Sequence, residues 1–166
     1  MSNDAGTTPT LGSLQHIGMV VKDVDKAMEY YSALGMGPFE LYIVRDREAW
    51  VHGKLTTCTL KIGFCPLGAG VTLALVECVD GQGIHDEILE CYGGGINHIA
   101  FAVEDLEGET ARMEKTGVAP AMIPVAEKPD NVYFDTREIG DTYIEFYRMG
   151  RFEQGLMELN SQKQRL

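Results

Sequence analysis

The pattern His16-Ile-Gly-Met-Val-Val-Lys-Asp23 returns later in the chain as His98-Ile-Ala-Phe-Ala-Val-Glu-Asp105. Each copy is a short apolar run, typical of a buried strand, that begins with a histidine and ends at an aspartate able to cap a helix. The same spacing continues to a glycine in each copy, Gly35 and Gly117, where a helix would end. This internal similarity indicates that one structural unit has been duplicated.

Each copy continues with three further strand-like stretches, which are separated by turn residues. In the first copy they are Phe39–Val44, Thr57–Phe64 and Val71–Cys78, and in the second they are Ala121–Val125, Asn131–Asp135 and Thr142–Arg148. The sequence therefore predicts an α+β domain over residues 13–148, built from two tandem βαβββ modules. Module one covers about 13–80, a linker helix about 82–92, and module two about 95–148.

Two terminal segments flank the repeated units. Residues 1–12 are mostly small and polar, which predicts a flexible N-terminal tail. Residues 149–166 carry apolar side chains at helical spacing, among them Phe152 and Leu156, and predict a short helix. We expect this helix to pack on a partner in a homodimer.

Charge and cysteine content narrow the partners and the location. The chain has 14 Lys and Arg against 25 Asp and Glu, a formal net charge of −11. Nucleic acid and anionic membranes require a basic face, so neither is expected as a partner. We expect no secretory signal, because residues 1–10 show neither a basic nor an apolar region. The four scattered cysteines then favour reduced thiols in a cytoplasmic protein.

Two histidines and one glutamate form the candidate site. Because side chains alternate along a strand, His16 shares its face with Gly18, and His98 shares its face with small alanines. Glu145 lies on the last predicted strand among apolar neighbours. Two imidazoles and a carboxylate on converging strands match the 2-His-1-carboxylate arrangement, which binds a divalent transition metal and leaves coordination positions open.

Each of these residues also has a plainer interpretation. A single strand histidine is more often structural than a ligand, and Glu145 alone could face water at a sheet edge. The two histidines, however, occupy the same place in both copies. That coincidence favours a shared metal.

Three segments resemble the vicinal oxygen chelate superfamily, which includes glyoxalase I, methylmalonyl-CoA epimerase, extradiol dioxygenases and bleomycin resistance proteins. They are Gly95-Ile-Asn-His-Ile-Ala-Phe-Ala-Val103, Tyr133-Phe-Asp-Thr136 and Ile144-Glu145, and the resemblance covers about residues 12–148. The second half looks nearest to the epimerase-like branch. The resemblance implies a U-shaped, barrel-like mixed sheet with helices outside, and one divalent metal ion per domain, which could be Fe, Mn, Co, Ni or Zn. It also implies a small-molecule substrate and a homodimer.

Carried over by this resemblance, His16, His98 and Glu145 take the metal positions of the first, fifth and eighth strands. The fourth strand departs from the family pattern, because Ala74 stands where a ligand is usual. Either water completes a three-ligand site, or a bulge brings Glu77 inward. We favour the three-ligand site.

The resemblance further implies a metal-dependent isomerase or lyase that polarises a chelated carbonyl compound, such as the acyl-CoA methylmalonyl-CoA, for proton abstraction. Glu145 matches one catalytic glutamate of the epimerase branch, and Glu48 or His52 is the candidate for the other. The polar stretch around these two residues is more typical of an exposed loop.

Four further side chains are candidates for substrate binding. Arg45 and Arg47 could meet a substrate carboxylate or phosphate. Tyr143 and Tyr147 share the face of Glu145 on the last strand.

Two other functions remain open. The missing fourth ligand favours a non-haem Fe(II) extradiol dioxygenase as the alternative enzyme. A non-catalytic binding protein of the bleomycin-resistance type is the third candidate, although such proteins typically lack the metal ligands that this sequence retains.

Overall fold

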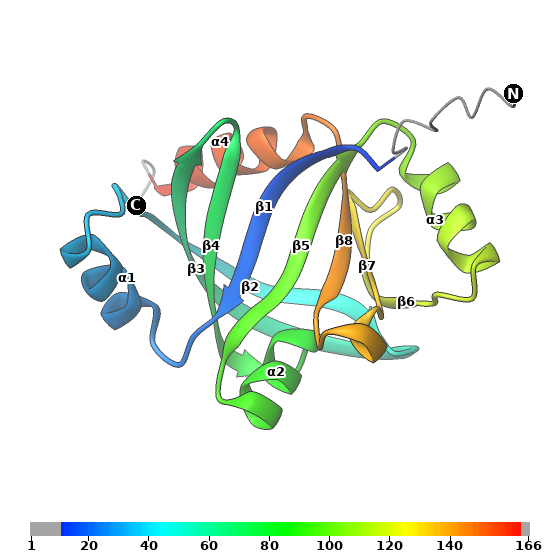
Figure 1. The fold of residues 1–166 in the computed structure, drawn as a ribbon, viewed down its shortest axis with the longest axis horizontal. Coiled ribbons are helices and arrows are strands. Elements are labelled where there is room, and N and C mark those ends of the chain that lie inside the picture. Colours follow the sequence, from blue (N-terminus) through cyan, green and yellow to red (C-terminus); the bar gives the residue numbers. More distant parts are fainter. Residues whose placement is uncertain (1–10, 164–166) are drawn as a thin grey trace, which may run out of the picture.

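The computed structural model describes residues 11–163, so residues 1–10 of the predicted N-terminal tail lie outside the described part. Within this range eight strands close into one mixed barrel, and four α-helices lie outside it (Figure 1). The predicted α+β fold is confirmed. The elements are β1 (Ser13–Val20), α1 (Val24–Ala33), β2 (Glu40–Val51), β3 (Lys54–Gly68), β4 (Val71–Gly81), α2 (Ile84–Tyr92), β5 (Gly95–Val103), α3 (Leu106–Lys115), β6 (Pro120–Pro124), β7 (Asn131–Phe134), the 3-10 turn η1 (Arg137–Ile139), β8 (Tyr143–Arg148) and α4 (Arg151–Lys163).

The order of strands around the barrel reflects the duplication. It is β1-β4-β3-β2-β6-β7-β8-β5, so each half contributes one uninterrupted block of four strands. Within each block the first strand pairs in parallel with the last, β1 with β4 and β5 with β8. The two halves join through the antiparallel pairs β1–β5 and β2–β6. The two histidine-bearing strands are therefore direct neighbours.

Capping residues place the module helices where the repeat predicts them. Asp23 precedes α1 and accepts a hydrogen bond from the Lys26 backbone N–H. Asp105 precedes α3 and accepts one from the Gly108 backbone N–H. Each bond satisfies one of the free donors at a helix N-terminus. The helix α1 packs on β3 and β4, while α3 packs on β7 and β8.

Strand β2 is longer than the sequence predicts. The polar stretch after Val44 continues as strand to Val51, and the chain turns at His52 and Gly53, both of which have positive φ. An extra residue at Arg45–Asp46 bulges opposite Thr59 and shifts the strand register by one. Because β2 pairs with β3 on one side and β6 on the other, backbone pairing outweighs the polar composition.

No helix among residues 11–163 combines the length and the apolar character that crossing a lipid bilayer requires.

Candidate metal centre

Three buried side chains converge inside the barrel. His16 Nε2 lies 3.1 Å from His98 Nε2, and Glu145 Oε2 lies 3.0 Å from the first nitrogen and 3.4 Å from the second. The exposed fractions are 4% for His16, 2% for His98 and 0% for Glu145. The three come from β1 and β5, which pair at the seam between the two modules, and from β8, the neighbour of β5.

The spacing of these atoms fits a shared divalent cation. Atoms bound to one metal at about 2.0–2.2 Å and roughly 90–110° apart lie about 3.0–3.5 Å from one another. Glu145 Oε2 is buried and has no well-oriented hydrogen bond, although it faces both imidazoles. An orphaned carboxylate oxygen is costly inside a protein unless a cation pairs it. The donor set of two nitrogens and one oxygen suits Fe, Mn, Co, Ni or Zn.

Two β-bulges aim the histidines at this point. In the β1–β5 pairing Gln15 is the unpaired residue of β1, and Asn97 is the unpaired residue of β5. Each bulge lies one residue before its histidine, and bulges of this kind redirect a neighbouring side chain. The bulge therefore belongs to the repeated unit, as does the histidine.

The bulged amides also set the tautomer of each imidazole. His16 Nδ1 lies 3.2 Å from Gln15 Oε1, and His98 Nδ1 lies 2.7 Å from Asn97 Oδ1. An amide oxygen only accepts, so each Nδ1 carries the proton and donates it. Each Nε2 then presents a lone pair to the centre, the form that binds metal. Burial lowers the pKa of His98 to about 3, which keeps this ring neutral.

Neither amide is among the residues predicted from the sequence. The signal was present, because an amide residue stands immediately before the histidine in both copies.

A Gln15→Leu variant tests this orienting role. We expect metal affinity to fall roughly 10- to 100-fold, the usual effect of losing a hydrogen bond to a ligand. The fold should persist, because Gln15 Nε2 is already buried without a partner and leucine removes that cost. Competition with a chelator measures the affinity, and thermal unfolding of the metal-free protein checks the fold. Unchanged affinity would contradict the role.

Glu145 is held by a second buried amide. Asn131 Nδ2 donates to Glu145 Oε1 at 2.5 Å, and Arg47 Nη2 donates to Asn131 Oδ1 at 3.3 Å. Burial alone would raise the pKa of Glu145, but His16, His98 and Asn131 outweigh it and hold this pKa at about 2. The carboxylate is therefore ionised, with Oε2 directed at the imidazoles.

A cavity of about 180 Å³ opens beside the three candidate ligands. Its walls are mainly apolar and aromatic, and its described lining comprises His16, Val44, Arg47, Ile62, Phe64, Ala74, Val76, His85, His98, Asn131, Tyr133, Glu145, Tyr147, Phe152, Gly155 and Leu156. Such a cavity would leave room for substrate or water beside a metal held by these three atoms.

The fourth strand supplies no ligand. Ala74 lines the cavity, but its methyl group cannot coordinate. Glu77 does not turn inward, because its Oε2 accepts a hydrogen bond from the Val24 backbone N–H at 2.8 Å, at the start of α1. Only the three-ligand alternative agrees with this arrangement.

Four of the predicted site residues do not line the cavity. Glu48 and Arg45 are exposed on β2, whose inward face is occupied instead by Arg47 after the bulge. His52 and Tyr143 belong to a network beneath α2, where His52 Nε2 lies 3.0 Å from Glu87 Oε1 and the Tyr143 hydroxyl donates to Glu87 Oε2 at 2.7 Å. Two predicted substrate residues, Arg47 and Tyr147, do line it.

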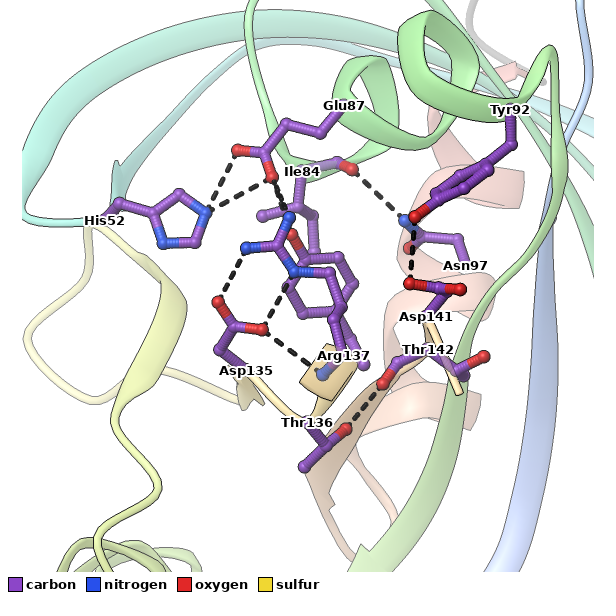
Figure 2. A network of polar contacts seen from close by, with 11 residues as sticks. His52, Ile84, Glu87, Tyr92, Asn97, Asp135, Thr136, Arg137, Asp141 and Thr142 are labelled. Carbon is purple, nitrogen blue, oxygen red and sulfur yellow. Dashed lines mark hydrogen bonds and ion pairs between the residues drawn. The ribbon is translucent and has the colours of Figure 1, made fainter. Parts of the chain in front are cut away.

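The network beneath α2 holds that helix against the barrel through hydrogen bonds (Figure 2). Arg137 donates to both oxygens of Asp135 and, through Nη1, to Glu87 at 2.7 Å. Asn97 Nδ2 donates to the Ile84 carbonyl at 3.1 Å. The amide that orients His98 therefore also fixes the first turn of α2.

That first turn carries a third cavity histidine, which the sequence analysis missed. His85 is 2% exposed and lines the cavity, and its ring centre lies 6.0 Å from that of His98. Its Nδ1 is buried without a hydrogen-bond partner among the described residues. The linker helix was predicted, but no local pattern indicates which side of its first turn faces the barrel.

Acid unfolding tests the buried state of His85. Burial, with a contribution from Arg47, lowers its pKa from the ordinary 6.5 to about 4. In the unfolded chain this histidine becomes protonated near pH 6.5, whereas in the folded chain it becomes protonated only near pH 4. The free energy of unfolding is therefore highest above pH 6.5 and falls as the pH is lowered toward 4. The loss attributable to His85 is roughly 3 kcal/mol. Urea unfolding of metal-free protein at pH 7 and 4.5 measures it.

His85→Asn should reduce this dependence by the part that His85 contributes, while the part due to buried His98 remains. His52→Asn serves as the control, because His52 is a partly exposed histidine outside the cavity, and should leave the dependence in place. Equal slopes for the wild type and His85→Asn would contradict the prediction.

The chain was compared with known proteins. A family model described as the Glyoxalase/Bleomycin resistance protein/Dioxygenase superfamily matches residues 15–134. A search of curated proteins finds no match. Methylmalonyl-CoA epimerase from Mycobacterium tuberculosis has a similar structure, with a TM-score of 0.62 and 22% identity over 86% of this chain and 91% of that chain.

Two further solved structures share the fold. A Streptomyces coelicolor methylmalonyl-CoA epimerase variant in complex with 2-nitronate-propionyl-CoA gives a TM-score of 0.60 at 18% identity, over 84% of this chain and 99% of that one. A 4-hydroxymandelate synthase mutant from Streptomyces coelicolor gives 0.57 at 16%, over 87% of this chain and 50% of that one. With the family model covering most of the barrel, the chain belongs to the glyoxalase/bleomycin resistance/dioxygenase superfamily.

Proposed function

We propose that the protein is a divalent-metal-dependent isomerase or lyase that activates a carbonyl substrate for removal of an α-proton. The observation that carries the proposal is the convergence of His16 Nε2, His98 Nε2 and Glu145 Oε2 next to a cavity. A metal held by these three atoms supplies Lewis acidity, which polarises a carbonyl oxygen and stabilises developing negative charge. The identity of the metal among Fe, Mn, Co, Ni and Zn is left to elemental analysis.

Residues around the three candidate ligands prepare this chemistry. Gln15 and Asn97 orient the imidazoles, while Asn131 holds the carboxylate. Phe152 stacks on the His16 ring, with ring centres 4.9 Å apart, and shields that ligand from bulk water. Exclusion of water strengthens each electrostatic interaction inside the site.

His85 is our candidate for the group that accepts the proton. The structure places Glu48 and His52 outside the cavity, so neither reaches a substrate there. Glu145 faces both imidazoles with Oε2 and bonds Asn131 with Oε1, which suits a ligand better than a base. Neutral His85 borders the cavity, and its Nδ1 has no hydrogen-bond partner in the described part of the chain, so this atom could accept a proton.

Exchange of substrate protons with deuterated water tests the proposal. Metal-loaded wild-type protein should exchange the α-proton of a member of a panel of 2-oxo acids and acyl thioesters. His85→Gln should slow exchange by roughly 10²- to 10⁴-fold while keeping the metal. Absence of exchange across the whole panel by metal-loaded protein would refute the isomerase or lyase function. Exchange at the wild-type rate by His85→Gln would contradict the role of His85 as proton acceptor.

A non-haem Fe(II) dioxygenase is the second candidate. Ala74 at the fourth position leaves two imidazoles and one carboxylate, the ligand set of this enzyme class. Protein reconstituted anaerobically with Fe(II) should then consume oxygen when a catechol is added. A silent oxygen electrode would exclude ring cleavage of the catechols tested.

A homodimer and a cytoplasmic location stay predictions. Phe152 of the C-terminal helix packs against His16 and Phe64 of its own barrel, so this side chain is not the one we expect at a dimer contact. Light scattering of the purified protein gives the oligomeric state.

A further inference from the structure

One face of α4 forms a wall of the metal cavity. Phe152, Gly155 and Leu156 all line it, and their spacing of three and four residues puts them on one side of the helix. The Phe152 ring stacks on His16 and meets the edges of Phe64 and Tyr147. In Figure 1 the helix runs from the end of β8 toward the β3–β4 hairpin. The helix therefore covers the metal ligands from one side.

The start of α4 is anchored. Arg151 Nε donates to Asp130 Oδ1 at 2.8 Å, and Arg151 Nη2 donates to Asp130 Oδ2 at 3.1 Å. Such a two-point guanidinium–carboxylate contact fixes orientation as well as distance. The Asp130 carbonyl in turn accepts from the Arg148 backbone N–H at 2.7 Å, so the anchor is tied to β8.

The covered cavity is small. Its volume of about 180 Å³ lies below the roughly 300–1,000 Å³ of pockets that bury drug-sized ligands. A coenzyme A thioester is larger than a drug-sized molecule, so its pantetheine and nucleotide parts would have to leave the cavity. Because the α4 face occupies one side of the cavity, such an exit would have to lie on another side.

The charged groups of the cavity also favour ligands of one charge. Among its described lining residues Glu145 is the one carboxylate and Arg47 the one guanidinium. The Arg47 side chain bonds Asn131 and forms no ion pair with a described carboxylate. With a divalent ion on Glu145 the net charge of the cavity is positive, which an anionic ligand neutralises.

Resting on the proposed function, we infer that the substrate is a small carboxylate-bearing carbonyl compound, not a coenzyme A thioester, and that α4 sets this size limit. The carbonyl group approaches the metal ligands, and Arg47 pairs with the carboxylate. Phe152, Gly155 and Leu156 are the residues that determine specificity.

Binding to the metal-loaded full-length protein tests the inference. Metal stoichiometry is measured first, and Co(II)-loaded protein is then titrated with pyruvate, 2-oxohexanoate and propionyl-CoA by calorimetry and visible absorption. Pyruvate should bind and propionyl-CoA should not compete with it. Arg47→Met should weaken the binding of pyruvate by roughly tenfold or more while leaving the binding of the neutral analogue pyruvamide unchanged.

Two variants of α4 act in opposite directions. A Cβ at Gly155 would meet no atom within 4 Å, so Gly155→Phe projects into open space and should lower pyruvate affinity by roughly tenfold or more. Leu156→Ala enlarges the cavity and should increase the affinity for 2-oxohexanoate relative to pyruvate. Glu158→Ala, an exposed position on the same helix, should change neither affinity.

The outcomes distinguish a failure of the proposed function from a failure of the inferred substrate class. If no metal binds, the proposed function fails and this inference fails with it. If the metal binds and propionyl-CoA competes with pyruvate, the inference alone is overturned. Size selection that is unchanged in both Gly155→Phe and Leu156→Ala would likewise overturn the role of α4.

Discussion

Replacing Glu145 by glutamine is expected to lower the affinity for a divalent metal by more than about a hundredfold, beyond the usual effect of losing an outer hydrogen bond. The amide keeps the shape and can still accept from Asn131, but it carries no charge and is a poor ligand. The metal-free variant should be less stable than the wild type at pH 7, because the low pKa of Glu145 means that the fold favours its ionised form, which glutamine lacks. Competition with a chelator and thermal unfolding with and without metal measure both effects.

Glu48→Gln is the matched control. It makes the same chemical change on an exposed residue of β2 outside the cavity, so metal affinity should stay at the wild-type value. A Glu145→Gln protein that retains one equivalent of metal with wild-type affinity would contradict the proposed ligand set.

Gly18→Ala is expected to abolish metal binding without touching a ligand. Gly18 lies opposite His98 in the β1–β5 pair, and a Cβ there would stand 1.9 Å from Cε1 and 2.3 Å from Nε2 of that ring. The ring must leave its place, which breaks its bond to Asn97 and removes Nε2 from the centre. Overpacking of this kind costs roughly 1–3 kcal/mol in folding stability. Elemental analysis and urea unfolding measure the two losses.

Gly83→Ala gives the comparison. Gly83 is also buried and also has an extended backbone, but a Cβ there meets only ordinary contacts, 3.8 Å to Cys58 Sγ and 3.9 Å to His85 Nδ1. Its metal content should remain at the wild-type level. If Gly18→Ala kept a full equivalent of metal, the ring of His98 would not need the space that glycine leaves.

Most of the fold can be predicted from the duplicated pattern. A histidine-led strand, a capping aspartate and a terminal glycine recur with constant spacing, so the repeat alone predicts two modules and their helices. Strand alternation then indicates which residues share the face of His16 and His98. In the structure these faces, together with Glu145, meet inside the barrel.

Bulges account for much of what the sequence alone did not reveal. One extra residue at Arg45–Asp46 reverses the alternation, so Arg47 enters the cavity while Glu48 remains outside. The same device at Gln15 and Asn97 lets each amide reach the histidine beside it. A bulge depends on the partner strand, and one strand read by itself does not contain that information.

Tertiary contacts also determine which side of a helix or strand faces outward. Glu77 could serve the metal by composition, but the free N-terminus of α1 takes it. His85 lies in the linker helix, whose rotation is set by the contacts of Glu87 and Ile84 with the second module.

A metal ion bound at the junction between β1 and β5 would also affect how the two halves of the chain associate. His16 belongs to one half of the chain, whereas His98 and Glu145 belong to the other. An ion bound by all three therefore cross-links the two halves, and by linkage its binding energy adds to the free energy of their association. A chain severed in the Gly93-Gly94-Gly95 linker would reassemble more tightly with the ion than without it.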